Sequence, residues 1–420
     1  MLVPALSHCP FPQHYPPEVC VRVNLINFGI TFSGLEDQLL GWVVIEERPD
    51  MEEKKAALTV ANARNMDELA KIEDTILYML ANSTGNILDD VVLIDTLAQS
   101  KVTSSEINAK VAESARVEQE IDVSRELYRP AANASAVLYF VVASLAEVDA
   151  MYQYSLDWYT DLFVRGIRQA PKPEDSADLP KRLELIDDFF TYYLYCNVCR
   201  LLFEKDKLLF SFLMTVKILQ SKKVDDGPPL VDPDEWRFLY SGKGAAGGAK
   251  LENPAPDWID ARMWDEMLGL GSLPQFAGFV EDLVGKDLKA WRAIYDSLEP
   301  HSAEFPGRWK DLGPFHRIMV LRCVRADKVP DAVTTYVIDK LGQRFVEPPP
   351  FHLPSCYEDA TCCTPLVFIL TKGSDPGKAF FNFAKDRKMD KKVASLSLGQ
   401  GQEVKAEKMI EEGIERGTWV

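Results

Sequence analysis

The sequence has few cysteines, few histidines and a shortage of positive charge. Its 420 residues include 8 cysteines and 5 histidines, and 47 Lys and Arg against 64 Asp and Glu give a net charge of −17. So few cysteines, without a ladder of spacings, indicate a reduced chain and exclude a disulfide scaffold. The acidic balance argues against nucleic acid or an anionic membrane as a partner, because proteins bind both by neutralising phosphates.

No stretch of the sequence is apolar for long enough to predict a membrane helix. The most apolar stretch, Ala131 to Ala146, is shorter than the ~20 residues that a bilayer requires, and it contains Asn133 and Ser135. The first residues lack a charged segment followed by an apolar run, so they predict no signal peptide. These absences favour a chain of the cytoplasm that meets no membrane.

Apolar and aromatic residues are plentiful, at 47% and 10% of the chain, which excludes a disordered protein. At ~150 residues per domain, the length predicts about three domains. The last residues, Trp419 and Val420, begin an apolar segment that is left without a partner. We therefore expect a fragment of a larger protein.

Two long helical stretches, separated by turn residues at 83–86, dominate the first third of the chain. Steps of three and four residues, typical of a coiled-coil seam, relate the apolar positions within each stretch. The predicted seam consists of Leu69, Ile72, Ile76, Met79, Ile107, Val111 and Ile121. The turn predicts an antiparallel hairpin, and a helix over 46–82 would reach ~55 Å. Periodicity alone leaves a protruding rod and a packed bundle about equally open, while the narrow apolar stripe favours the rod.

The remaining pattern predicts a mainly α fold with a minor α/β part. Alternation over 19–32 predicts a strand, and Ser33 with Glu36 forms a capping box that opens a helix. The acidic run 46–53 suits a helix N-terminus. Helical patterns then cover the following segments: a buried pair over 131–170, one long run over 183–219 and short helices over 257–340. Finally, 365–370 is an apolar run that predicts a buried parallel strand.

The loop after this last run resembles a phosphate-binding loop only in part. Gly373, Gly377 and Lys378 stand between a predicted strand and a predicted helix, as a P-loop requires. The two glycines are too close together, Ala379 replaces the hydroxyl that would hold Mg²⁺, and Pro376 removes an N–H donor. We therefore expect a degenerate P-loop position rather than a working nucleotide site.

No other pattern predicts catalysis or metal binding. Cys196 and Cys199 lie within a helical run and have no second ligand pair, so we interpret them as core thiols. His352 and the cysteines that follow it are too irregularly spaced to predict a metal site. The chain shows neither a Ser-His-Asp nor an HExxH arrangement. The residues therefore predict no catalytic group and no metal ligand.

Several strings, taken together and in order, resemble the heavy chains of axonemal dyneins, and they cover nearly the whole chain. The strings are PQHYPPEV from Pro12, NFGITFSGLEDQLLGWVVIEERPDMEEKK from Asn27, YRPAANASAVLYF from Tyr128, MYQYSLDWYTDLF from Met151, LFEKDKLLFSF from Leu202, WRAIYDSLEPH from Trp291, VLRCVRADKV from Val320, EPPPFHL from Glu347 and SLSLGQGQ from Ser395.

The resemblance implies a place in a motor ring of six AAA+ modules. It implies the following divisions: the end of the fifth large subdomain over 1–34, a coiled-coil buttress or strut over 35–130, the helical lid of the fifth module over 131–225, a helical connector over 226–355, and the truncated start of the sixth large subdomain, of α/β P-loop-like type, over 356–420. The sixth module of this family binds no nucleotide, which agrees with the degenerate loop.

The resemblance also implies the activity of the whole family, which consists of ATP-driven, minus-end-directed microtubule motors of the ciliary or flagellar axoneme and uses ATP and Mg²⁺. The expected partners are neighbouring AAA+ modules, the stalk of the same heavy chain, and intermediate and light chains. The microtubule would be contacted only through a stalk tip that these residues do not contain. We expect this segment to be structural and without a cofactor of its own. Two alternatives stay open: a nucleotide-binding P-loop protein that uses Gly373 to Lys378, and a stand-alone helical scaffold.

Overall fold

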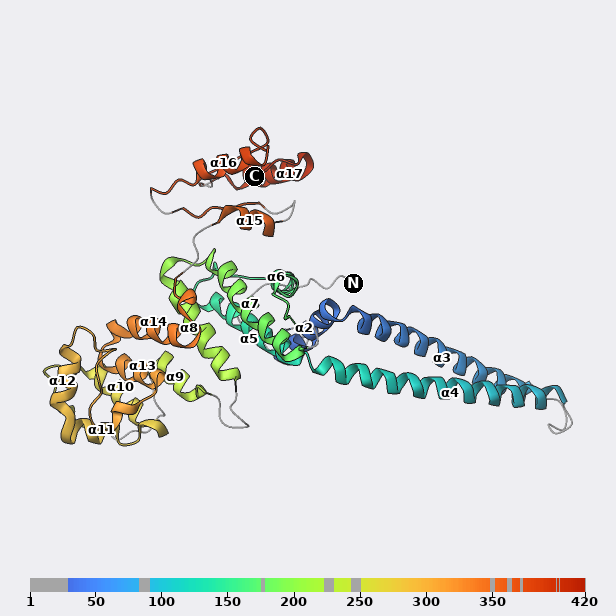
Figure 1. The fold of residues 1–420 in the computed structure, drawn as a ribbon, viewed down its shortest axis with the longest axis horizontal. Helices are drawn as coiled ribbons and strands as arrows, with labels where there is room; N and C mark the ends of the chain where they lie inside the picture. Colours follow the sequence, from blue (N-terminus) through green and yellow to red (C-terminus); the bar gives the residue numbers. More distant parts are fainter. Residues whose placement is uncertain are drawn as a thin grey trace, which may run out of the picture. The chain divides into compact units, whose positions relative to one another are not determined.

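The computed structural model has two compact units, Met1–Glu347 and Pro348–Val420. Throughout the residues that it describes, the regular structure is helical, apart from one isolated bridge between Val393 and Trp419 (Figure 1). The prediction of a mainly α fold is therefore confirmed. The described residues are 29–82, 91–174, 178–222, 230–242, 251–347, 352–360, 365–370, 373–397, 399 and 401–419.

The first unit contains two long helices, α3 (Pro49–Asn82) and α4 (Val91–Glu126), which lie side by side (Figure 1). They have 34 and 36 residues, or about 50 Å each at the usual rise. Ion pairs between 52 and 125 and between 55 and 122 show that the two helices run antiparallel. We refer to α3 and α4 as the hairpin. The predicted turn at 83–86 lies outside the described residues.

The hairpin begins later than the predicted range 35–130. That range includes α2 (Phe32–Glu47), whose Leu35 is buried and which packs against α5 and α6 rather than continuing the rod. The chain leaves helical geometry at Arg48, with φ −140° and ψ 63°, and α3 then starts at Pro49. A residue before proline is disfavoured in the helical region, and proline itself is favoured in a first helical turn.

The predicted capping box at the start of α2 is wrong by two residues. The N-cap is Thr31, whose hydroxyl accepts a hydrogen bond from the Gly34 N–H at 3.2 Å, and not Ser33. Either hydroxyl satisfies the same chemical need, because the first helical N–H groups lack intrahelical partners. Most of the predicted strand over 19–32 lies outside the described residues, and its last residue is the first of α2.

Helix α5 (Arg129–Ser144) lies among three other helices of this unit. It packs against α2, α7 (Leu179–Cys199) and α8 (Glu204–Ser221). Together with the turn η2 (Leu145–Glu147), α5 is long and apolar enough to cross a membrane, the one such helix within the described parts of the chain. Half of it is buried inside the protein, and its contacts with three neighbouring helices account for that burial.

Aromatic rings fill the space between α5, α6 (Leu156–Gln169) and α7. The ring of Phe190 meets those of Tyr159 and Phe163 edge to face, with centroids 5.8 Å and 4.9 Å apart. It also lies against Gly166, where a Cβ would come within 2.7 Å of the ring. This packing confirms the predicted buried helical pair over 131–170.

The predicted helical run over 183–219 consists of two helices, because α7 ends at Cys199 and α8 begins at Glu204. The buried hydroxyl of Tyr152 explains the break. It accepts a hydrogen bond from the Phe203 N–H at 3.1 Å and donates one to Asp206 at 2.7 Å. A side chain from another segment thus satisfies the backbone that the break leaves open, which no periodicity in 183–219 reveals.

Short helices form the rest of the first unit, as predicted for 257–340. Their core is a cluster of buried rings around Trp291, with Phe279 and Phe305 at centroid distances of 5.5 Å and 5.2 Å. We refer to α2 together with α5 to α14 as the body. The further elements are α9 (Pro233–Ser241), α10 (Ala261–Gly271), η3 (Pro274–Phe276), α11 (Phe279–Asp282), the π-helical turn η4 (Leu283–Asp287), α12 (Leu288–Asp296), η5 (Gly307–Asp311), α13 (Pro314–Val324), η6 (Ala326–Lys328), α14 (Val329–Lys340) and η7 (Gln343–Phe345).

The second unit contains α15 (Leu353–Asp359), α16 (Gly377–Asp386) and α17 (Glu403–Arg416). The predicted buried strand at 365–370 is wrong here, because these residues form no strand and Val367, Ile369 and Leu370 are exposed. A parallel strand exists only when neighbouring strands supply its hydrogen bonds. Among the described residues of this unit, the Val393–Trp419 bridge is the one strand-like pairing, and it does not involve 365–370.

Candidate functional site

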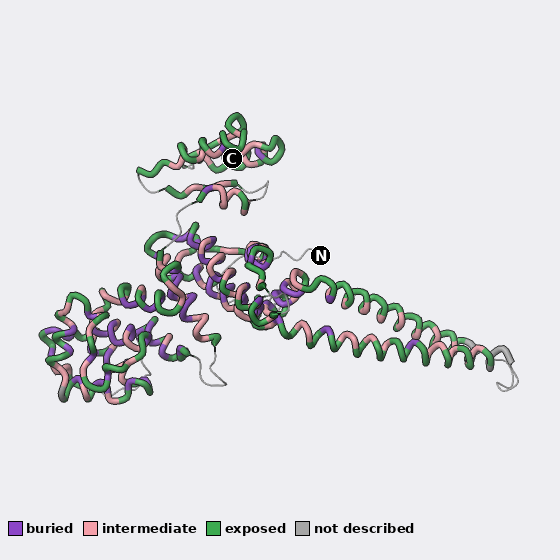
Figure 2. The backbone as a smooth tube through the Cα atoms, in the orientation of Figure 1, coloured by how far each residue is buried: buried purple, intermediate pink, exposed green. Residues whose placement is uncertain are grey.

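The least exposed residues of the hairpin form one stripe along each helix, on the sides where α3 and α4 meet (Figure 2). Steps of four and three residues relate them along both helices, which is the spacing of a two-helix seam. On α3 the stripe consists of Met51, Lys55, Leu58, Asn62, Asn65, Leu69, Ile72 and Ile76, and on α4 of Leu97, Ser100, Ser104, Ile107, Val111, Ser114, Glu118, Ile121 and Arg125.

The structure places most of the predicted seam residues on these stripes. Ile107 and Ile121 are buried, and Leu69, Ile72, Ile76 and Val111 are partly buried, whereas the side chain of Met79 lies outside the described residues. The prediction missed the polar members of the seam. Spacing alone would have found them, because Asn62 and Asn65 continue the same steps towards the base.

Polar groups tie the two helices together near the base of the hairpin. Lys55 Nζ lies 2.6 Å from Asp122 Oδ1, and Arg125 Nη1 lies 3.5 Å from Glu52 Oε2. Further out, the amide oxygen of Asn62 is buried without a hydrogen-bond partner. A polar group at such a position lowers stability while it fixes the register of the two helices.

At the junction between hairpin and body, acidic residues at the end of α2 meet arginines of the body. Arg168 contacts Glu46 at 2.6 Å and Arg182 contacts Glu47 at 2.7 Å. The acidic run 46–53 was predicted to suit a helix N-terminus, and this is wrong for its first two residues, which end α2. Carboxylates are unfavourable at a helix C-terminus, and the two arginines compensate for them.

The returning chain is held to the same helix where α4 meets α5. The guanidinium of Arg129 lies 3.0 Å from Asp37 Oδ1 and 3.6 Å from Glu36 Oε2, and it also pairs with Glu126. The hydrogen bonds that Arg129 donates to Glu126 and to Asp37 raise its pKa further above the ordinary value. Arg129 thus ties the end of α4 to α2, whereas at the other end of the hairpin the charged contacts hold the end of α2, after which α3 begins.

The P-loop position in the second unit does not form a phosphate cradle. Gly373 has a φ of +93°, and Gly377 is the first residue of α16. The Gly377 N–H donates to Asp375 Oδ1 at 2.9 Å, so a carboxylate already occupies this helix N-terminus, and Pro376 supplies no N–H. Lys378 is exposed on the first turn. At this helix start the Gly377 N–H is therefore not free for a phosphate, and the Asp375 carboxylate would repel one.

The described thiols of the body show no catalytic arrangement. Cys199 is buried on α7, and burial raises the pKa of its thiol to about 12, so a core role is favoured over reactivity. Within the described residues, no group of three or more His, Cys, Asp or Glu could hold a metal ion. The predictions of no catalytic residue and no metal site stay predictions.

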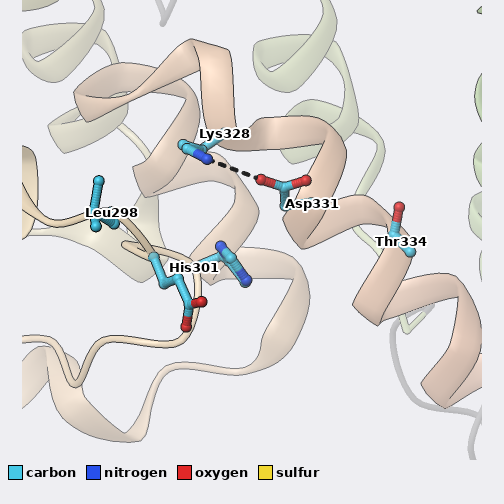
Figure 3. Close-up of a pocket in the computed structure, with 6 residues that line it drawn as sticks. Leu298, His301, Lys328, Asp331 and Thr334 are labelled. Atoms are coloured by element: carbon cyan, nitrogen blue, oxygen red, sulfur yellow. Dashed lines mark hydrogen bonds and ion pairs between the residues drawn. The ribbon is translucent and has the colours of Figure 1, made fainter.

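A hollow of about 510 Å³ lies beside α14 (Figure 3). Its charged groups of opposite sign pair with each other, since Lys328 Nζ lies 3.4 Å from Asp331 Oδ2. Thr334 donates to the carbonyl of Pro330 at 2.8 Å, which leaves it turned into its own helix. The hollow therefore gathers no nucleophile beside a base, and it is lined by Leu298, Glu299, His301, Lys328, Asp331 and Thr334.

Comparison with known proteins assigns the chain to a family. Residues 9–107 match the profile described as "ATP-binding dynein motor region", and residues 361–420 match "Dynein heavy chain region D6 P-loop domain". Human "Dynein axonemal heavy chain 1" is 46% identical over 97% of this chain, and mouse "Dynein axonemal heavy chain 3" is 43% identical over 97%. "Dynein-1-beta heavy chain, flagellar inner arm I1 complex" of Chlamydomonas reinhardtii is 39% identical over the same share.

The chain spans about a tenth of these relatives, 9% of the human and Chlamydomonas proteins and 10% of the mouse protein. The matches nevertheless extend over almost its whole length, across the hairpin, the body and the second unit. The chain belongs to the axonemal dynein heavy chain family.

Proposed function

We propose that this chain is the part of an axonemal dynein heavy chain that couples the AAA+ ring to the stalk, with the α3–α4 hairpin, which lies within the predicted range 35–130, as the buttress. The observation that carries the proposal is the α3–α4 hairpin, whose two-helix seam is tied across its base by Lys55 and Asp122 and whose last residue, Glu126, pairs with Arg129 of the body. The proposed divisions around it are the end of the fifth large subdomain over 1–34, the lid over 131–225, the connector over 226–355 and the start of the sixth large subdomain over 356–420.

The proposed mechanism is mechanical. An antiparallel coiled coil of about 50 Å transmits a displacement of its base to its tip, provided that the seam keeps the two helices in register. Coupling of this kind needs two ring states that move the base differently. The hairpin follows α2 and precedes α5 in the chain, and Arg129 at the start of α5 pairs with both Glu126 of the hairpin and Asp37 of α2.

We further propose the activity and surroundings of the whole protein. It is an ATP-driven, minus-end-directed microtubule motor of the ciliary or flagellar axoneme, which uses ATP and Mg²⁺. Its partners are the neighbouring AAA+ modules and stalk of the same heavy chain, together with intermediate and light chains. The family names and the names of the relatives support this proposal.

The segment itself is proposed to bind no nucleotide, since Asp375 occupies the helix N-terminus where a phosphate would lie. Calorimetric titration of the chain with ATP and Mg²⁺ should give no heat of binding. A micromolar dissociation constant that Lys378→Ala abolishes would instead favour the nucleotide-binding alternative.

The mechanical role is tested in a full-length axonemal dynein heavy chain that carries this segment in place of its own. The double substitution Ile72→Asp and Ile76→Asp puts two charges into the seam, and it should lower the ratio of microtubule-stimulated to basal ATPase by about fivefold or more. Val60→Asp with Leu77→Asp is the matched control, because the same charges then lie on exposed positions of α3. Normal stimulation in the seam variant would contradict the proposal.

A further inference from the structure

All five N–H groups of Arg182 have an acceptor. Nε and Nη2 donate to the two oxygens of Glu47 at 3.1 Å and 2.7 Å. Nη2 also donates to the carbonyl of Ile167 at 3.0 Å. Nη1 donates to the carbonyls of Ala170 and Pro171 at 3.0 Å and 2.7 Å. A guanidinium has five donors in a rigid plane, and here each is used.

These bonds join three elements at one point. Glu47 is the last residue of α2, directly before the break at Arg48 that leads into the hairpin. The carbonyls belong to the end of α6 and the residues after it, and Arg182 itself lies in the first turn of α7. The side chain of Arg182 is 7% exposed. A buried bidentate pair of this kind fixes orientation as well as distance.

The neighbouring pair of Arg168 and Glu46 differs in ways that make it a control. Arg168 donates from Nε and Nη2 to the same carboxylate at 2.8 Å and 2.6 Å, so the fork geometry is similar. However, its side chain is 62% exposed, and among the described contacts it donates no hydrogen bond to a backbone carbonyl. Solvent and salt weaken an exposed pair, while a buried pair keeps its geometry.

We propose that Arg182 is the positioning residue that holds the base of the hairpin in a fixed direction relative to α6 and α7. This inference rests on the proposed function and names the residue through which the body would turn the hairpin. A shift of α6 relative to α7 displaces the carbonyls bound by Arg182, and the bidentate contact carries the displacement to Glu47 and so to α3.

The inference predicts a different result for arginine and for lysine at the same position. Lysine keeps the positive charge but has three donors on a flexible stem, so it can balance Glu47 without fixing its orientation. In the full-length heavy chain described above, Arg182→Lys should lower the ratio of microtubule-stimulated to basal ATPase by about fivefold, with basal ATPase retained. Arg168→Lys should leave both quantities unchanged.

A second variant separates orientation from folding. Arg182→Met with Glu47→Leu removes both charges, so that no uncompensated carboxylate is left buried. It should cost less stability than Arg182→Met alone, because no carboxylate is left buried without its partner, and it should lower the ATPase ratio as Arg182→Lys does. Hydrogen exchange should rise at 44–52 and 166–172 in both variants and remain unchanged over 204–221.

The outcomes distinguish this inference from the proposed function. If Arg182→Lys and the double variant keep the ratio while the seam variant lowers it, the inference is wrong and the buttress role stands. If the seam variant also keeps the ratio, the proposed function itself fails. An equal loss with Arg168→Lys would show that the effect is not specific to the buried pair, and a normal ratio in the double variant would show that the oriented bonds of Arg182 are not needed; either result would overturn the inference.

Discussion

The hairpin and the body consist of the same kind of secondary structure but bury different side chains. In the body, rings such as those of Tyr159 and Phe190 are enclosed from all sides, and Figure 2 shows buried residues throughout its helices. In the hairpin, each helix covers one narrow stripe, which on α3 includes the partly buried Lys55 and Asn62, and most of the remaining surface is exposed. The hairpin therefore depends on one line of contacts, and the body depends on a three-dimensional core.

This difference implies that damage spreads differently in the two regions. A core residue of the body touches several helices, so its loss weakens them together. A seam residue touches only the facing helix, so its loss stays near the site and leaves the body intact. Tryptophan fluorescence can tell the regions apart, because residues 49–126 contain no tryptophan, whereas far-ultraviolet circular dichroism reports both.

The largest effect is expected for Phe190→Ala. The substitution leaves a cavity between Tyr159, Phe163 and Gly166, and it should cost about 3–5 kcal/mol of body stability. The measurement is the urea midpoint of tryptophan fluorescence, which should fall markedly. The control Val123→Ala, at a hairpin position that is 64% exposed, should change it by less than about 0.5 kcal/mol. Equal effects would contradict the contrast between core and rod.

A smaller and local effect is expected for Ile107→Ala. The residue is buried in the seam, and its truncation should cost about 2 kcal/mol, at the low end for such changes because only one helix faces it. Hydrogen exchange should accelerate over 95–120 and remain unchanged over 179–221. Val102→Ala, at a position on the same helix that is 59% exposed, is the matched control. Faster exchange throughout the body would show that the two regions unfold as one.

The elements that the sequence predicts well are those whose pattern is local. Steps of three and four residues around Ile72 and Ile107 reveal the seam because a helix brings such residues to one face. The break before Glu204 was missed because a distant side chain, Tyr152, makes the hydrogen bonds that stabilise it.

The junction could not be predicted for a similar reason. Arg182 and Glu47 are 135 residues apart, and neither belongs to a motif. The run 365–370 shows the opposite failure, because an apolar, β-branched composition predicts a strand only when other strands lie beside it. Composition reveals what a segment can bury, whereas the pairing itself depends on residues far away in the chain.

A stabilising change is expected for Asn62→Leu, with a smaller magnitude. The amide oxygen is buried and has no hydrogen-bond partner, so an apolar side chain of similar size should stabilise the hairpin by about 1 kcal/mol. Hydrogen exchange over 55–70 should slow. Asn108→Leu, at an exposed position of α4, should have little effect on exchange. Faster exchange in Asn62→Leu would show that the amide is satisfied in solution and that the seam needs it.

The smallest effect is expected from acid, and its sign should differ between the two regions. Hydrogen bonds from Arg116 and Arg129 lower the pKa values of Glu113 and Glu126 on the hairpin. A lowered folded-state pKa adds stability above the ordinary value of about 4.3, and that stability is lost as the pH falls through the lowered value. In the body, burial raises the pKa of Asp187, so the folded state is favoured by its protonation as the pH falls.

Between pH 5 and 3, as an order-of-magnitude window from ordinary carboxyl values, helix content should therefore weaken before tryptophan fluorescence changes. Because the hairpin carboxylates are exposed, roughly 1 M salt should screen their pairs and remove the acid dependence of the hairpin alone. Simultaneous loss of both signals, with or without salt, would mean that the rod has no stability of its own and that the contrast between the two regions is wrong.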